Sequence, residues 1–62
     1  MKVTWRWRYD GAVGESQDFP SQADAETWLG DEWRALLDGG VTAVTLTEDG
    51  REVYGPMGLE PA

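Results

Sequence analysis

The chain has 62 residues, of which 12 are acidic and 5 are basic, so its formal net charge is −7 and it forms one small domain with a limited core. It contains no cysteine and no histidine, which excludes disulfides, thiolate metal sites and a histidine proton shuttle. No apolar run approaches the roughly 20 residues that span a bilayer, and the N-terminal pattern is that of a strand rather than a signal peptide. We therefore expect a cytoplasmic protein without a membrane segment.

The first predicted element is a strand over residues 1–10. Its apolar side chains occupy every second position, which is typical of a strand with one buried face: Met1, Val3, Trp5, Trp7 and Tyr9. Residues 10–14 contain two glycines and predict a turn. Residues 15–19 then predict a short returning strand with Phe19 pointing inward.

A helix is predicted from Ser21 to Asp38, with Ser21 as its N-cap and glycines after its end. Six apolar residues share one face at helical spacing: Ala25, Trp28, Leu29, Trp33, Leu36 and Leu37. Gly30 costs about 1 kcal/mol relative to alanine inside a helix, and a break with Asp31 capping a second short helix is the alternative. Because the apolar stripe continues in phase, we expect one helix, with Gly30 allowing a neighbouring ring or backbone to approach closely.

Residues 41–48 and 51–55 predict a hairpin around the two-residue turn Asp49-Gly50. Such a turn places Glu48 opposite Arg51, Leu46 opposite Val53 and Thr45 opposite Tyr54. In this register the two faces of the hairpin are distinct. The buried face carries Val44, Leu46 and Val53, and the other face carries Thr45, Thr47, Glu52 and Tyr54.

Residues 56–62 form a tail with two prolines and no periodicity, which excludes a strand interior or a helix. Whether Met57 and Leu59 fold back onto the core or belong to a flexible end stays open at this point. The predicted class is α+β: a ββαββ domain over residues 1–55, with an antiparallel sheet of about four strands and one helix across one face. The uncovered face is expected to carry Lys2, Thr4, Arg6 and Arg8, with Arg6 or Arg8 meeting Glu52; the strand order is not determined.

The sequence predicts no catalytic, cofactor or metal site, and therefore no enzyme. Ser16 and Ser21 have no histidine to act as a base. The carboxylate pairs at 24 and 26 and at 31 and 32 diverge, because helical residues one or two apart do not face each other. The glycines at 11 and 14 are too closely spaced for a phosphate-binding loop.

Acidic residues dominate positions 15–38, where Arg34 is the one basic residue. Such a field repels nucleic acid, and solubility alone is one explanation for it. The functional hypothesis is a protein-binding module, which docks its acidic helix face on a basic surface or accepts a partner strand or second copy at a sheet edge. Two alternatives are a nucleic-acid mimic and an RNA-binding sheet face with Lys2, Arg6, Arg8 and Tyr54.

The four tryptophans are interpreted as core residues that bury large rings. The alternative is that one of them, Trp28 at the edge of the helix stripe, is partly exposed and anchors a partner. The candidate partner-binding residues are Asp24, Glu26, Trp28, Asp31, Glu32, Tyr54 and Met57.

The runs SQADAETWLG at 21–30, GVTAVTL at 40–46 and GREVYGPMGL at 50–59 cover most of the chain. They resemble a group of short, acidic actinobacterial proteins of ββαββ plan to which no activity is assigned. The resemblance implies the fold and no activity. It also implies that Tyr54 to Met57 form a defined motif that closes the core or belongs to a binding surface.

Overall fold

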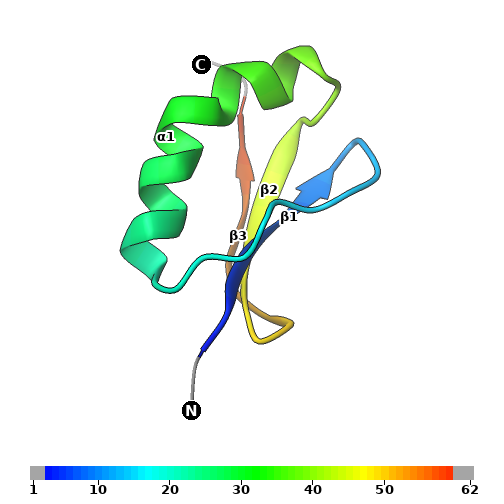
Figure 1. The fold of residues 1–62 in the computed structure, drawn as a ribbon. Coiled ribbons are helices and arrows are strands. Elements are labelled where there is room, and N and C mark those ends of the chain that lie inside the picture. Colours follow the sequence, from blue (N-terminus) through cyan, green and yellow to red (C-terminus); the bar gives the residue numbers. More distant parts are fainter. Residues whose placement is uncertain (1–2, 60–62) are drawn as a thin grey trace.

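The computed structural model describes residues 3–59 as a three-stranded antiparallel sheet with one helix against it (Figure 1). The elements in chain order are β1 (Trp5–Asp10), α1 (Gln22–Asp38), β2 (Ala43–Glu48) and β3 (Arg51–Gly58). The strands are ordered β1-β2-β3, so β2 is central. The α+β class is confirmed, but the part of the chain described here has three strands in the order β-α-β-β, not four. Met1 and Lys2, which the first predicted strand included, lie outside the described residues.

The predicted strand at 15–19 is instead an irregular segment that lies beside β1. The Phe19 N–H donates to the Trp5 carbonyl oxygen at 2.7 Å, and the Ser16 N–H donates to that of Trp7 at 2.8 Å. The Trp7 N–H, in turn, donates to the Ser16 hydroxyl at 2.8 Å. Because this side chain takes the place of a backbone acceptor, the ladder is interrupted and only isolated bridges form. The segment nevertheless covers the outer edge of β1.

Helix α1 has the predicted ends and runs through Gly30 without a break. The Ser21 hydroxyl accepts from the Asp24 N–H at 3.1 Å, which caps the first turn. At the other end the Gly39 N–H donates to the carbonyl oxygens of Ala35 and Leu36. The expected close approach at Gly30 is wrong: a Cβ placed there would meet nothing within 4 Å.

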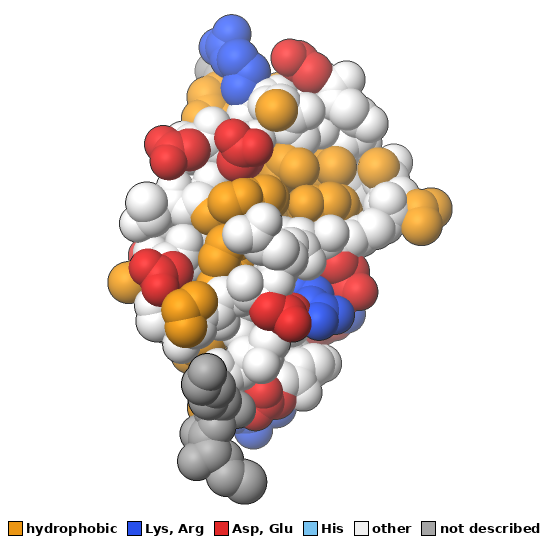
Figure 2. Space-filling view, in the orientation of Figure 1, with side chains coloured by type: hydrophobic (Ala, Val, Ile, Leu, Met, Phe, Trp, Pro, Cys, Tyr) orange, Lys and Arg blue, Asp and Glu red, His pale blue; other side chains and the backbone are white. Residues whose placement is uncertain are grey.

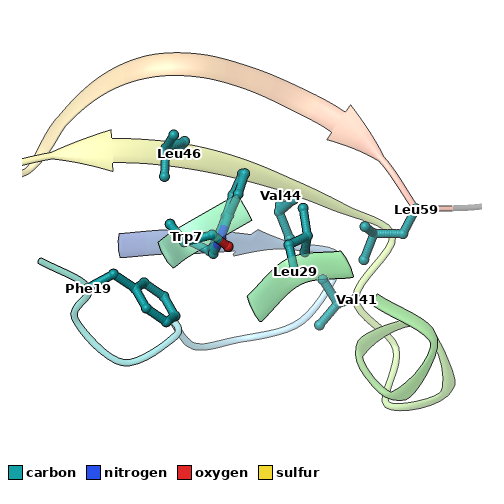
Figure 3. Close-up of a cluster of buried hydrophobic side chains, with 8 residues drawn as sticks. Trp7, Phe19, Leu29, Val41, Val44, Leu46 and Leu59 are labelled. Carbon is teal, nitrogen blue, oxygen red and sulfur yellow. The ribbon is translucent and has the colours of Figure 1, made fainter. Parts of the chain in front are cut away.

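Buried side chains from β1, α1, β2 and their connecting segments, together with the residue after β3, form the core between sheet and helix (Figure 3). They are Trp7, Phe19, Ala25, Leu29, Val41, Val44, Leu46 and Leu59. Trp7 is 1% exposed, and its indole N–H donates to the Ala25 carbonyl oxygen at 2.8 Å. Among residues 3–59 this is the one hydrogen bond that joins a sheet side chain to α1, so it fixes the position of the helix over β1. The other three tryptophans are partly buried and pack against this cluster.

The hairpin turn is confirmed, but the register beyond it differs from the prediction. Asp49 and Gly50 have φ values of 52° and 86°, and Glu48 pairs with Arg51 as expected. After Glu52 the strand bulges, so that Leu46 pairs with Tyr54 instead of Val53. Val53 is therefore 42% exposed, although the predicted register placed it on the buried face.

Thr45 and Thr47 are buried, at 2% and 5% exposure, although we expected them on the uncovered face. They belong to the central strand, and side chains from both outer strands lie beside them. The Arg8 guanidinium of β1 forms an ion pair with the Glu52 carboxylate of β3, across β2. The predicted meeting of Arg6 or Arg8 with Glu52 is thus confirmed for Arg8, and this pair shields the threonines from solvent.

Strand β3 continues to Gly58, so the prediction that residues from Pro56 onward exclude a strand is wrong for 56–58. Proline is tolerated here because β3 is an edge strand and Pro56 lies within a second irregularity, between the pairs Leu46–Tyr54 and Val44–Met57. Leu59 is 7% exposed and Met57 packs against the core. Of the two alternatives for these residues, the structure therefore has the one in which they fold back onto the core. The rest of the predicted tail, 60–62, lies outside the described residues.

Candidate binding groove between the helix and the third strand

The single helix covers the sheet unequally. An α-helix is about 10 Å wide and neighbouring strands lie about 4.8 Å apart, so one helix covers about two strands. Because the Trp7–Ala25 hydrogen bond holds α1 over β1, the helix side of β3 is left open, and the side chains of β3 are exposed except for the partly buried Met57.

The result is an open groove of about 830 Å³ between α1 and β3. From α1 the walls include Glu26, Gly30 and Trp33, and from β3 they include Tyr54 and Met57. Buried side chains of Trp7, Leu29 and Leu59 border the groove on its inner side, and Gln22 and Gly58 complete the lining. Along the helix, the stretch from Gln22 to Trp33 corresponds to about 17 Å at 1.5 Å per residue. The surface is therefore elongated and mainly apolar, with few polar groups.

Tyr54 reaches this groove because of the bulge at Val53. Without the extra residue, Tyr54 would pair with Thr45 and project from the opposite face of the sheet. Paired with Leu46 instead, it lies on the helix side and is 57% exposed. An exposed aromatic ring at the edge of an apolar groove offers a large contact surface to a partner.

Two glycines line the groove from opposite elements, Gly30 from α1 and Gly58 from β3. A Cβ added at either position would meet nothing within 4 Å. Gly30 therefore lowers the helix stability without any packing requirement from its own chain. The free space at both positions is available to a bound molecule.

The charges of the sheet and of the helix are arranged differently. Arg6 pairs with Asp18 at 2.5 Å and with Glu15 at 3.4 Å, and Arg51 pairs with Glu48 at 3.1 Å. With the pair of Arg8 and Glu52, these are all the ion pairs found in residues 3–59, and none uses a helix carboxylate. The unpaired carboxylates of α1 are those of Asp24, Glu26, Asp31, Glu32 and Asp38. The helix is thus a strongly negative surface next to the groove.

Arg34 is the only basic residue of α1. Its guanidinium carbon lies 5.4 Å from the centre of the Trp33 ring, within the range of a cation–π interaction. It is therefore placed at the end of the groove that Trp33 lines, whereas Glu26 lies nearer the opposite end.

The structure divides the predicted partner-binding residues among three surfaces. Glu26, Tyr54 and Met57 come together at the groove. Asp24 and Asp31 are exposed and, being seven residues apart, share the outward side of α1. Trp28 and Glu32, four residues apart, lie on the side of α1 away from the groove.

Trp28 is not the freely exposed anchor that the sequence suggested. It is partly buried, and its ring packs at 5.5 Å and a 50° tilt against that of Phe19. On this side Figure 2 shows a band of hydrophobic side chains between α1 and the turn after β1, with carboxylates around it. The band closes the core against β1, whereas the groove lies on the other side of the helix.

The alternative of an RNA-binding sheet face receives little support from the described residues. Arg6 and Arg8 are both engaged by carboxylates, so phosphate groups would have to displace those partners. Tyr54 projects into the groove and is not on that face, so no stacking platform is formed with the arginines.

Tyr9 provides a titratable probe of the surface around Glu32. Burial raises the pKa of the Tyr9 phenol above its usual 10.0, and the charge of Glu32 raises it further. In a Tyr54→Phe background, where Tyr9 is the only tyrosine, we expect Glu32→Gln to lower this pKa without fully restoring the usual value, because burial is the larger cause. Absorbance of the phenolate during alkaline titration measures it.

The same shift predicts how stability depends on pH. The pKa of Tyr9 is higher in the folded protein than in the unfolded chain. The neutral Tyr9 phenol therefore contributes fully to the free energy of unfolding below pH about 10, and this contribution is lost as the pH rises through the folded pKa. The free energy of unfolding in the Tyr54→Phe background should therefore fall over that range, and less steeply with Glu32→Gln. An unchanged pKa in the glutamine variant would contradict the placement of Glu32.

A scan against protein-family models found no match for this chain, and searches of curated proteins and of solved structures found no similar protein. Across residues 3–59, no helix has the length and apolar character needed to cross a membrane. Within the same part of the chain, no three acidic side chains are grouped closely enough to hold a metal ion.

Proposed function

We propose that this protein is a non-catalytic binding module that holds an apolar segment of another protein in the groove between α1 and β3. The observation that carries the proposal is the groove itself, in which Trp33, Tyr54 and Met57 are available for contact and two glycines leave room. Concave, mainly apolar surfaces with a few polar groups are the usual form of a binding site.

The charge distribution supports a partner that is basic beside its apolar segment. The helix carboxylates form no ion pairs in the described part of the chain, and the net charge of the whole protein is −7. A cationic protein would be attracted by this field and would associate faster at low ionic strength. A second copy of the chain would bring another −7 to the interface, which disfavours the homodimer alternative.

A sheet edge is a weaker candidate for docking than the groove. The outer edge of β1 is covered by residues 15–19, so β3 presents the remaining edge of this sheet. Its ladder is interrupted by the bulge at Val53 and by Pro56, which has no N–H to donate. These are features with which natural proteins prevent the addition of a strand.

Two leucine substitutions on the same helix test the proposal. Gly30→Leu would fill the groove, whereas the control Thr27→Leu lies on the exposed outer side of α1. Both substitutions favour the helix, by roughly 0.8 and 0.4 kcal/mol, so neither should unfold the protein. We expect one partner protein to be retained from a lysate of the source cells by the unmodified protein and by Thr27→Leu, and to be lost with Gly30→Leu.

The measurement is quantitative affinity purification followed by mass spectrometry, with the free energy of unfolding determined for each variant. A partner that Gly30→Leu retains in full would show that the groove is not the binding site. Equal loss with both variants would indicate the outer helix face instead, which is also where a nucleic-acid mimic would bind its target.

A further inference from the structure

We infer that the occupant of the groove is an amphipathic helix of about three turns, with an apolar face and basic flanks, which lies beside α1 over β3. This inference rests on the proposed function and specifies the shape and chemistry of the partner segment. One strand of the sheet is left uncovered beside α1, so a second helix there would contact the groove side of α1 and lie on β3, with its outer side beyond the sheet edge. The lining from Gln22 to Trp33 spans about 17 Å, which corresponds to about 11 residues of a helix.

Gly30 supports a helical occupant. Packed helices lie 8–10 Å apart, depending on the side chains at their contact. With no Cβ at Gly30 and nothing within 4 Å of that position, a second helix can approach the backbone of α1 closely. A glycine in the middle of α1 that no contact of its own chain requires is explained by such an approach.

The edge of β3 weighs against an extended occupant. A strand added to β3 needs a continuous row of outward N–H and C=O groups. The bulge at Val53 and the missing N–H of Pro56 interrupt that row. A helix satisfies its own backbone hydrogen bonds and contacts the groove through side chains alone, so these interruptions do not affect it.

The charged side chains at the groove indicate where charged side chains of a partner would be favoured. Glu26 lines the groove and accepts a hydrogen bond from the Gln22 side chain at 3.0 Å, but it has no cationic partner among residues 3–59. Arg34 stands beside Trp33, toward the other end. The attraction for a basic flank of the partner is therefore strongest beside Glu26 and weakest beside Arg34.

Three synthetic peptides test the inference. The first places leucine at positions i, i+3, i+4 and i+7 with lysine on its flanks, and the second has the same composition with leucine at every second position. The third is the first with glutamate in place of lysine. Each is titrated into the isotopically labelled protein, with amide shifts mapped by nuclear magnetic resonance and peptide helicity followed by circular dichroism.

We expect the first peptide to become helical, to shift the amides of Gly30 and Gly58, and to bind Gly30→Leu about tenfold more weakly. Thr27→Leu should bind it like the unmodified protein, and the glutamate peptide should bind at least tenfold more weakly, about 1.4 kcal/mol. Groove binding by the alternating peptide alone would overturn the helical inference and leave the groove as a binding site. Binding that Gly30→Leu does not weaken, or no binding of the first peptide, would also overturn it. The lysate experiment then decides separately whether the groove binds a partner.

Discussion

Phenylalanine in place of Trp7 is expected to lower the free energy of unfolding by about 3 kcal/mol. The smaller ring leaves part of a fully buried site empty, with a loss of both transfer free energy and packing. It also removes the indole N–H that donates to the Ala25 carbonyl oxygen, a hydrogen bond worth about 1 kcal/mol net. Domains of this size have a total stability of roughly 3–9 kcal/mol, at 0.05–0.15 kcal/mol per residue, so the effect is large.

Trp28→Phe is the matched control, because it makes the same chemical change at a partly buried ring on α1. It should cost about 1 kcal/mol or less, since the ring contact with Phe19 is retained in part. Thermal and urea unfolding followed by circular dichroism measure both variants, with a midpoint shift of about 4–8 °C per kcal/mol. Equal losses in the two variants would show that the Trp7–Ala25 contact does not position the helix.

Elements with strong local signals were predicted correctly. The cap at Ser21, the glycines after Asp38 and the Asp49-Gly50 turn each depend on chemistry within a few residues, and the structure has all three. The depth of burial was less accessible, because the period of two treats Trp5 and Trp7 alike. Trp7 is the fully buried ring because it pairs with Leu46 of the central strand β2, and this position lies under α1.

The predicted pairing of β2 with β3 is wrong beyond the turn because β3 contains extra residues, which a regular two-residue hairpin does not have. A two-residue turn fixes the first pairs, but one extra residue at Val53 reverses the facing of the side chains after it, until the second irregularity restores it at Met57. For the second irregularity Gly55-Pro56 is the available signal, because glycine and proline inside a strand pattern mark a bulge. Interpreting it as the end of the strand places residues 56–58 outside the sheet. The wrong face predicted for Tyr54 comes from the bulge at Val53, which no glycine or proline marks.

The candidate site was foreseen only in part. Glu26, Tyr54 and Met57 were expected to contact a partner, and the structure brings these three together at the groove. The groove itself results from where α1 lies across the sheet, which the sequence does not encode locally. Gly30 was the strongest local signal for it, since an apolar helix stripe that includes a glycine is weakened for no reason visible in the helix.

Gly55→Ala is expected to destabilise the protein by about 3 kcal/mol. Gly55 has φ +121°, in a region that side chains other than glycine rarely adopt, which costs about 1–2 kcal/mol. An added Cβ would also lie 2.9 Å from the Val44 carbonyl oxygen and 3.0 Å from the Thr45 Cα, both in the backbone of the central strand. Relief would require β3 to move away from β2, so the strain cannot be absorbed by a side-chain rotation.

Gly58→Ala is the control on the same strand, because its Cβ meets nothing within 4 Å and its φ is not positive. It should change stability by no more than about 0.5 kcal/mol. Urea unfolding of both variants gives the comparison. Full stability of Gly55→Ala would show that β3 does not need this conformation, and the pairing of Leu46 with Tyr54 would lose its support. Because that pairing is what places the Tyr54 ring on the helix side, this one substitution tests the fold and the basis of the binding site together.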